Sequence, residues 1–265
     1  MHLISHFYNE EFLLPFWLKH HVPLFDHGVM IDYGSTDNSV DIIRQLAPSW
    51  EIRPTKNEWF VEPQIGQEVM GIEQEFKGWK IALNVTEFIL HHDLRAYTEG
   101  LGVKPGICTN GVIMVDDPGS KGEYNEDELL VYQKTHGYFE VDILTKGMST
   151  TNVRMCSRKR LLHQQPSGQY SLGRHTNNIT REQDTNLFVC WFGWSPFTQE
   201  IKDRKKQIQH KAPESQKRRK PWSRCYCVDD VKLEEMYGIE SSRSYSLLDK
   251  EEYKSALQRF VDARS

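Results

Sequence analysis

The sequence has few cysteines, no long apolar run and no strong excess of charge of either sign. Five cysteines occur among 265 residues. Because they are sparse and odd in number, we expect free thiols in a reducing compartment rather than a disulfide framework. Only Cys225 and Cys227 are closely spaced, and a C-x-C pair alone is a weak zinc signal. The formal net charge of −4 gives no overall bias toward nucleic acid or membranes.

Membrane and export signals are also missing from the sequence. No apolar stretch reaches the roughly 18 residues that a membrane span needs. The first residues lack a charged-then-apolar leader and already have the character of a strand. We therefore expect a soluble, cytoplasmic protein, which leaves peripheral membrane contact open. Hydrophobic residues make up 38% and aromatic residues 11% of the chain, enough for one large core.

The first 95 residues show apolar patterns that alternate between the strand and helix periods. This alternation predicts an α/β fold, in which a mostly parallel sheet carries helices on both faces. Farther along the chain the alternation fades, and we expect a basic strand or sheet edge ending at 163, a functional loop at 166–178 and mainly helical structure over 181–209. One or two amphipathic helices are expected to close the chain after residue 229. The expected strands of the first part cover 2–7, 28–32, 50–53 and 79–83, and its helices cover 12–18, 38–46 and 63–77.

Polar side chains follow three of the predicted strands. Asn9, Asp32 and Glu87 come just after apolar segments. Ligands of parallel sheets bind beyond the carboxyl ends of the strands, so these side chains should meet at one edge. Asp32 also begins an Asp-x-Gly-Ser-x-Asp turn. Its carboxylate either accepts hydrogen bonds from a ribose or base, or belongs to an ordinary capped turn between a strand and a helix.

These stretches together resemble the family 2 glycosyltransferases. The resemblance rests on residues 7–11 (FYNEE) and 31–37 (IDYGSTD), and a subgroup match extends over 9–21 (NEEFLLPFWLKHH), 78–88 (GWKIALNVTEF) and 173–175 (GRH). It implies a Rossmann-like glycosyltransferase A-type fold and inverting transfer from a UDP- or GDP-linked sugar to a glycan or glycoconjugate. Residues 1–95 would bind the nucleotide, 96–220 the diphosphate and acceptor, and 221–265 would form a helical extension. The implied nucleotide-binding residues are Tyr8, Asn9, Glu11, Asp32, Gly34 and Ser35.

The sequence departs from the family at its metal motif. The family commonly has Asp-x-Asp after the fourth strand, whereas this chain has Asn84, Thr86 and Glu87 there. Mg²⁺ and Mn²⁺ prefer charged oxygen ligands. Three interpretations stay open: these residues hold a weakly bound cation, the leaving diphosphate is stabilised without metal, or the protein has lost its activity.

Several further residues are candidates for the chemistry. The resemblance favours Asp184 or Glu182 as the catalytic base, although either acid can equally cap or solvate a helix. Arg174 and His175 are expected to contact the diphosphate, and Arg158 belongs to a second basic group with Lys159, Arg160 and His163. The alternatives for these groups are a loop histidine with a local hydrogen bond and an exposed basic strand.

Two regions farther along the chain are consistent with more than one role. The basic segment 202–220 either covers the diphosphate, binds an anionic acceptor, lies on acidic lipid or is a solvated helix face. Trp191, Trp194 and Phe197 are core aromatics or a platform for a sugar. The competing functions are a catalytically degenerate glycan-binding or scaffold protein and a sugar-phosphate nucleotidyltransferase. The second is disfavoured because residues 8–11 lack the Gly-rich basic loop that such enzymes carry.

Overall fold

The computed structural model describes residues 1–145, 158–213 and 229–265. The cysteine pair at 225 and 227, the basic end of the 202–220 segment and the predicted boundary at residue 220 therefore lie outside the described residues. Cys108 and Cys190 are free thiols, as expected. None of the helices within the described ranges is long and apolar enough to cross a bilayer.

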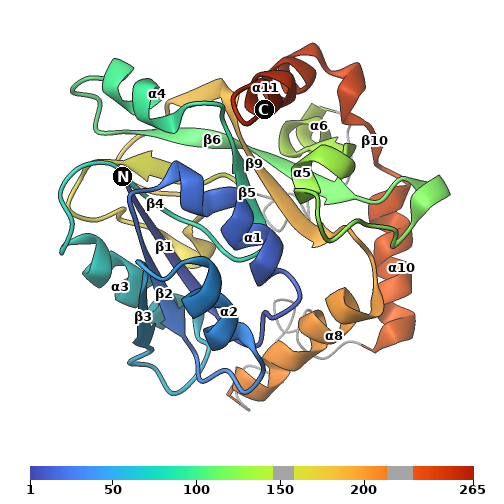
Figure 1. Ribbon diagram of the computed structural model, residues 1–265, viewed down its shortest axis with the longest axis horizontal. Helices are drawn as coiled ribbons and strands as arrows, with labels where there is room; N and C mark the ends of the chain where they lie inside the picture. Colours follow the sequence, from blue (N-terminus) through green and yellow to red (C-terminus); the bar gives the residue numbers. More distant parts are fainter. Residues whose placement is uncertain (146–157, 214–228) are drawn as a thin grey trace.

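Residues 2–82 form the parallel first part of a ten-stranded sheet (Figure 1). Its strands lie in the order β3-β2-β1-β4 and all pair in parallel. The predicted α/β class is confirmed by this arrangement. The strands are β1 (His2–Phe7), β2 (His27–Asp32), β3 (Glu51–Pro54) and β4 (Lys80–Ala82), and the helices between them are α1 (Leu14–His21), α2 (Ser39–Leu46) and α3 (Glu62–Glu73).

Helices cover both faces of this parallel region because side chains alternate along each strand. Leu3 of β1 packs with Trp17 of α1 and Ile43 of α2 in the main core. Its neighbour Ile4 points to the other face and packs with Val69 of α3 in a second, smaller cluster. The alternation thus fixes α1 and α2 on one face and α3 on the other.

The rest of the chain extends the sheet mainly with antiparallel pairs. The exception is β6, which pairs in parallel with β9 and antiparallel with β7 and β8. Strand β8 pairs with β4, which joins the two parts of the sheet, and β9 pairs with β5. The elements are β5 (Glu87–Leu90), α4 (Leu94–Gly100), β6 (Gly106–Val115), α5 (Leu130–Gln133), β7 (His136–Phe139), α6 (Glu140–Thr145), β8 (Leu161–His163), β9 (Gln183–Trp194), α8 (Gln199–Gln207), α10 (Asp230–Ser241), β10 (Tyr245–Ser246) and α11 (Glu251–Asp262).

The prediction of mainly helical structure over 181–209 is wrong for its first part. Residues 183–194 form β9, and only 199–207 form a helix, α8. Residues 187–190 are buried between β5 and β6, so the apolar run carries neither the strand nor the helix period. A short buried strand and a buried helix segment cannot be distinguished from such a run.

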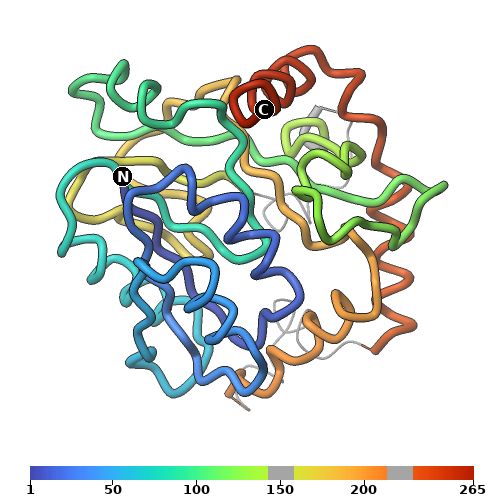
Figure 2. The backbone as a smooth tube through the Cα atoms, viewed as in Figure 1, coloured from blue at the N-terminus to red at the C-terminus, as the bar shows by residue number. Residues whose placement is uncertain are grey.

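The C-terminal helices belong to the main core. Tyr253, Leu257 and Phe260 of α11 are buried in the same cluster as Trp17 and Phe88. These helices lie on the other side of the molecule from α2 and α3 (Figure 2). The closing helices predicted after residue 229 are confirmed as α10 and α11.

Candidate functional site

The turn after β2 is held by hydrogen bonds from its own residues and from the turn after β1. Asp32 Oδ1 accepts from the Ser35 amide at 2.8 Å. Asn9 Oδ1 accepts from the Thr36 amide at 2.7 Å, and the Asn9 amide donates to Ser35 Oγ at 3.1 Å. Asn9 has a left-handed backbone with φ 51°, and its hydrogen bonds join the two turns at the carboxyl ends of β1 and β2. Asp32 Oδ2 has no hydrogen-bond donor among the described residues.

The end of α8 and the 3₁₀ helix η5 (Ile208–Lys211) cross over this turn. Gln207 donates to the carbonyl oxygen of Asn9 at 2.6 Å. Lys211 Nζ lies 4.7 Å from the centre of the Tyr8 ring. Gly34, with φ 78°, approaches the same ammonium group, since a Cβ there would lie 3.4 Å from Lys211 Nζ. The structure therefore brings Tyr8, Gly34 and a lysine together beside the Asp32 turn.

The acids Glu10 and Glu11, in the turn after β1, form contacts with α8 and α2. Glu10 is buried and pairs with Arg204 of α8 through two hydrogen bonds of 2.5 Å. Burial raises the pKa of Glu10, and Arg204 opposes that rise. Glu11 accepts from the Asn38 amide at 3.1 Å and from the Asn38 side chain at 2.9 Å, at the start of α2. The predicted nucleotide residue Glu11 thus engages α2 in this structure.

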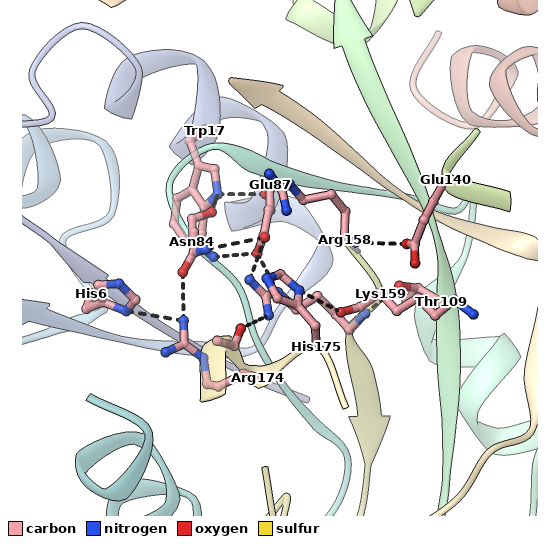
Figure 3. Close-up of polar contacts among 12 residues, drawn as sticks. His6, Trp17, Asn84, Glu87, Thr109, Glu140, Arg158, Lys159, Arg174 and His175 are labelled. Atoms are coloured by element: carbon pink, nitrogen blue, oxygen red, sulfur yellow. Dashed lines mark hydrogen bonds and ion pairs between the residues drawn. The ribbon is translucent and has the colours of Figure 1, made fainter. Parts of the chain in front are cut away.

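The motif after β4 centres on a buried ion pair (Figure 3). Glu87 and Arg160 are 0% and 1% exposed. Arg160 Nε and Nη2 each donate to one oxygen of Glu87 at 2.6 Å. The Asn84 amide donates to Glu87 Oε2 at 2.8 Å, and its side-chain nitrogen to Oε1 at 3.3 Å. Both oxygens of Glu87 are therefore occupied by nitrogen donors.

Arg174 lies beside this pair in an unusual backbone conformation. It follows Gly173 in the 3₁₀ helix η4 (Leu172–Arg174), and φ is 59° at Arg174 and 75° at Gly173. Arg174 Nη2 donates to Asn84 Oδ1 at 2.6 Å and contacts His6 Nδ1 at 3.4 Å (Figure 3). Left-handed non-glycine residues are uncommon and cost roughly 1–3 kcal/mol, and they cluster at functional sites.

A cavity of about 100 Å³ opens against Arg174 at the edge of the parallel strands. The lining residues come from the carboxyl end of β1, the turn after β4, the start of α3 with the segment just before it, and the η4 loop. The lining residues are His6, Phe60, Glu62, Ile65, Asn84, Gly173, Arg174 and His175. The structure thus brings the predicted residues Asn84, Arg174 and His175 into one cavity.

Both histidines of the cavity are held in the neutral form. Burial is the main cause that lowers the pKa of His6 well below its usual value, and Arg174 and Arg160 add to it. Burial also lowers the pKa of His175, with the same two arginines and Arg158 as further causes. Neutral His6 accepts a hydrogen bond from Arg174 through Nδ1. The histidines therefore serve as hydrogen-bonding groups, and Arg174 supplies the positive charge.

The residues at the expected metal motif do not fit a divalent cation. Glu87 has no free oxygen, Asn84 Oδ1 accepts from Arg174, and Thr86 is buried. Unit charges of like sign 4 Å apart repel by about 4 kcal/mol near a protein surface, so a cation here would be opposed by Arg174. Within the part of the chain that the structure describes, no three His, Cys, Asp or Glu side chains are grouped to hold a metal.

A buried carboxylate anchors the loop that carries Arg174. Glu73 of α3 is 0% exposed. It accepts from the Tyr170 hydroxyl at 2.6 Å and from the Gly168 amide at 2.7 Å, and it contacts His163 Nε2 at 3.2 Å. Arg160 donates to the Gly173 carbonyl at 2.7 Å from the other side. The loop predicted at 166–178 is thus held at Gly168 and Tyr170 by Glu73 and at Gly173 by Arg160.

The predicted bases lie away from the cavity. Asp184 accepts from the Tyr97 hydroxyl at 2.8 Å, and Glu182 pairs with Lys104 at the surface. Along β9, Trp191 is the residue that pairs with Glu87. Asp184 stands seven residues before Trp191, roughly 23 Å along an extended strand. The structure does not bring Asp184 or Glu182 to Arg174.

Arg158 also lies outside the residues that line the cavity. Its guanidinium stacks 3.9 Å from the centre of the Trp191 ring, and its amide donates to Glu140 Oε2 at 2.8 Å. Trp194 is buried and has Lys205 Nζ 3.7 Å from its ring centre. Trp191 is partly exposed. Trp194 therefore belongs to the core, whereas Trp191 lies at the surface beneath Arg158.

Sequence reasoning missed the central role of Arg160. It stood in a basic group interpreted equally as an exposed strand, whereas Arg160 and His163 are buried. The available signal is the run Leu161-Leu162 directly after Arg160, which marks a buried strand. His6, Phe60, Glu62 and Ile65 carried no motif that could have placed them in a cavity.

Comparisons with known proteins give only distant likenesses. No family model matches the chain, and no curated protein matches it. The crystal structure of Staphylococcus aureus (S. aureus) TarS 1-349 superposes with a TM-score of 0.41 at 9% identity, over 99% of this chain and 80% of that one. The complex of S. aureus TarS 1-349 with UDP-GlcNAc gives 0.32 at 14% identity, over 47% and 36% of the two chains. A mannose-1-phosphate geranyltransferase from Thermus thermophilus gives 0.27 at 13% identity, over 46% and 42%.

At these TM-scores the likenesses do not establish what this chain binds or catalyses. The matched region spans about a third of the UDP-GlcNAc complex, 36% of its length. The functional conclusion therefore depends on the site itself.

Proposed function

We propose that this protein is an inverting glycosyltransferase of the A-type fold, which moves a sugar from a nucleoside-diphosphate donor to a glycan or glycoconjugate. The observation that carries the proposal is the buried guanidinium of Arg174 at the same sheet edge as the Asp32 turn. Nucleotides bind at this edge of open parallel sheets. The motif resemblance at residues 31–37 and 78–88 supports the same chemistry.

Each part of the site has a role in this proposal. Asp32 offers Oδ2 to a ribose hydroxyl, because its other oxygen already accepts from Ser35. Tyr8 and Lys211 stand beside that turn and border the nucleoside. Arg174 faces the phosphates from the cavity, where charge develops as the donor bond breaks. Asp184 and Glu182 lie away from the cavity, at the start of β9 and just before it, so the assignment of either as the catalytic base stays a prediction.

Binding of nucleoside diphosphates tests the proposal first. Calorimetric titration with UDP, GDP, ADP and CDP should show one preferred nucleotide, and the matching nucleotide sugars should release it in the presence of protein. Asp32→Asn should weaken the preferred nucleotide by roughly tenfold. Asp41→Asn is the matched control, because Asp41 is 79% exposed on α2. Failure of every nucleotide to bind would refute the proposal.

One observation favours a second candidate, a nucleotide-binding protein without turnover. Glu62 is the only carboxylate among the residues that line the described cavity, and it lies exposed at its rim. Inverting transfer needs a base for the acceptor hydroxyl. Nucleotide binding of wild-type strength without release from any nucleotide sugar would favour this candidate.

A further inference from the structure

Arg174 is a buried cation that forms no ion pair with any of the residues that the structure describes. Its side chain is 4% exposed. In the described ranges no Asp or Glu forms an ion pair with it, and its Nε is buried without a hydrogen-bond partner. Its known contacts are the neutral groups Asn84 and His6. A buried charge with unused donors is costly unless a ligand completes it.

The neighbouring arginine has the opposite arrangement. Arg160 is paired with both oxygens of Glu87, so the two side chains together carry no net charge. Its remaining Nη1 donates to the carbonyl of Gly173 and so fixes the backbone that presents Arg174. Glu87 therefore holds the side chain of Arg160, and Arg160 holds the backbone of the η4 turn. Arg174 is the group that faces the cavity.

Electrostatics in the cavity point the same way. Burial is the main cause that lowers the pKa of Arg174, and repulsion from Arg160 is the next, while Glu62 and Glu87 oppose it. An anion placed in the cavity would offset both effects, because it attracts the charged guanidinium. Glu62 is the acid at the rim, with Oε2 3.8 Å from the position that a Cβ on Gly173 would take. It is exposed and can turn toward water when an anion enters.

We propose that Arg174, positioned by the Arg160–Glu87 pair, replaces the divalent cation and binds the phosphate of the leaving group directly, so that the site acts without metal. This inference rests on the proposed function for its substrate. When the sugar–oxygen bond of the donor breaks, its electron pair stays on the phosphate oxygen. The acceptor oxygen forms the new bond to the sugar and loses its proton to solvent water, and the nucleoside diphosphate leaves as the anion. Arg174 meets the charge that the phosphate gains, through a charge-assisted hydrogen bond.

Inorganic pyrophosphate is a suitable probe, because it carries the diphosphate without sugar or base. Calorimetric titration of the full chain with pyrophosphate in excess EDTA should show binding. A second titration, with Mn²⁺ in place of EDTA, should give the same affinity. Arg174→Gln should weaken binding by roughly 10- to 100-fold, the value of one or two charge-assisted bonds. Arg174→Lys keeps the charge but not the planar fork and should recover part of the loss. Arg44→Gln, at an arginine that is 68% exposed, should bind as the wild type does.

The outcomes separate this inference from the proposed function. Binding that appears only with Mn²⁺, or that rises more than about tenfold with it, overturns the metal-free site and leaves the proposed function standing. Absence of pyrophosphate binding with and without Mn²⁺ also overturns the site. An Arg174→Gln protein that melts like the wild type and binds equally well overturns the role of Arg174. Metal-free, Arg174-dependent binding without turnover of any nucleotide sugar supports the anion site and refutes the transferase.

Discussion

The buried pair of Glu87 and Arg160 gives the sharpest prediction about stability. Replacing Glu87 with Gln removes the charge but keeps the shape of the side chain. Arg160, at 1% exposure, then remains charged without a counter-ion. Removing one partner of a buried pair costs about 3–5 kcal/mol in the free energy of unfolding. For a chain of this size that loss lowers the melting temperature by roughly 6–20 °C. Urea denaturation in EDTA, followed by circular dichroism, measures it.

A metal-ligand role for Glu87 predicts the opposite pattern. In EDTA, Glu87→Gln would then change the free energy of unfolding little, and Mn²⁺ would raise the melting temperature of the wild type by binding only the folded state. Asp41→Asn is the control, because the Asp41–Arg44 pair is 79% and 68% exposed and such pairs contribute about 0–1 kcal/mol. A loss below about 1 kcal/mol for Glu87→Gln would refute the reasoning.

Three further predictions concern the core. Burial lowers the pKa of His20 to about 3, against roughly 6.5 in the unfolded chain. The contribution of neutral His20 to the free energy of unfolding is therefore complete above pH 6.5 and is lost as the pH falls toward 3. Urea titrations between these pH values should show a loss of up to about 1.4 kcal/mol per pH unit, and His20→Gln should make the dependence on pH shallower. Gly28→Ala should destabilise the protein by about 1–3 kcal/mol, because the added Cβ would lie 2.2 Å from the Trp50 ring. Gly71→Ala in α3, where the added Cβ meets open space, should stabilise it by up to about 1 kcal/mol. Equal melting temperatures for the two variants would contradict this reasoning. Glu73→Gln should cost about 1–3 kcal/mol and speed proteolysis within 164–178, because Tyr170 and Gly168 lose their charged acceptor; unchanged cleavage would argue against the anchor.

Local patterns predicted the parallel half of the fold well. The strands and helices up to residue 83 carry clear periods, and the turn at Asp32 has its glycine and polar residues in consecutive positions. The convergence of Asn9 and Asp32 followed from strand ends that share one sheet edge. These features depend on neighbours in the sequence, so one sequence suffices to infer them.

The cavity could not be predicted because it depends on distant partners. Glu87 and Arg160 are 73 residues apart, and Arg174 and His6 are 168 apart. No spacing rule links them, so Glu87 was interpreted as a metal ligand rather than as the partner of an arginine. The base candidates failed to converge for a related reason: the apolar run of β9 was interpreted as a helix, which hides the direction of the strand.

The most direct test of the account is release of nucleoside diphosphate from the preferred nucleotide sugar in a single turnover, with protein in excess and EDTA present. The account predicts release at the same rate as with Mn²⁺, and a rate lowered at least about tenfold by Arg174→Gln but not by Arg44→Gln. Release that requires Mn²⁺, or that is unaffected by Arg174→Gln, would contradict it.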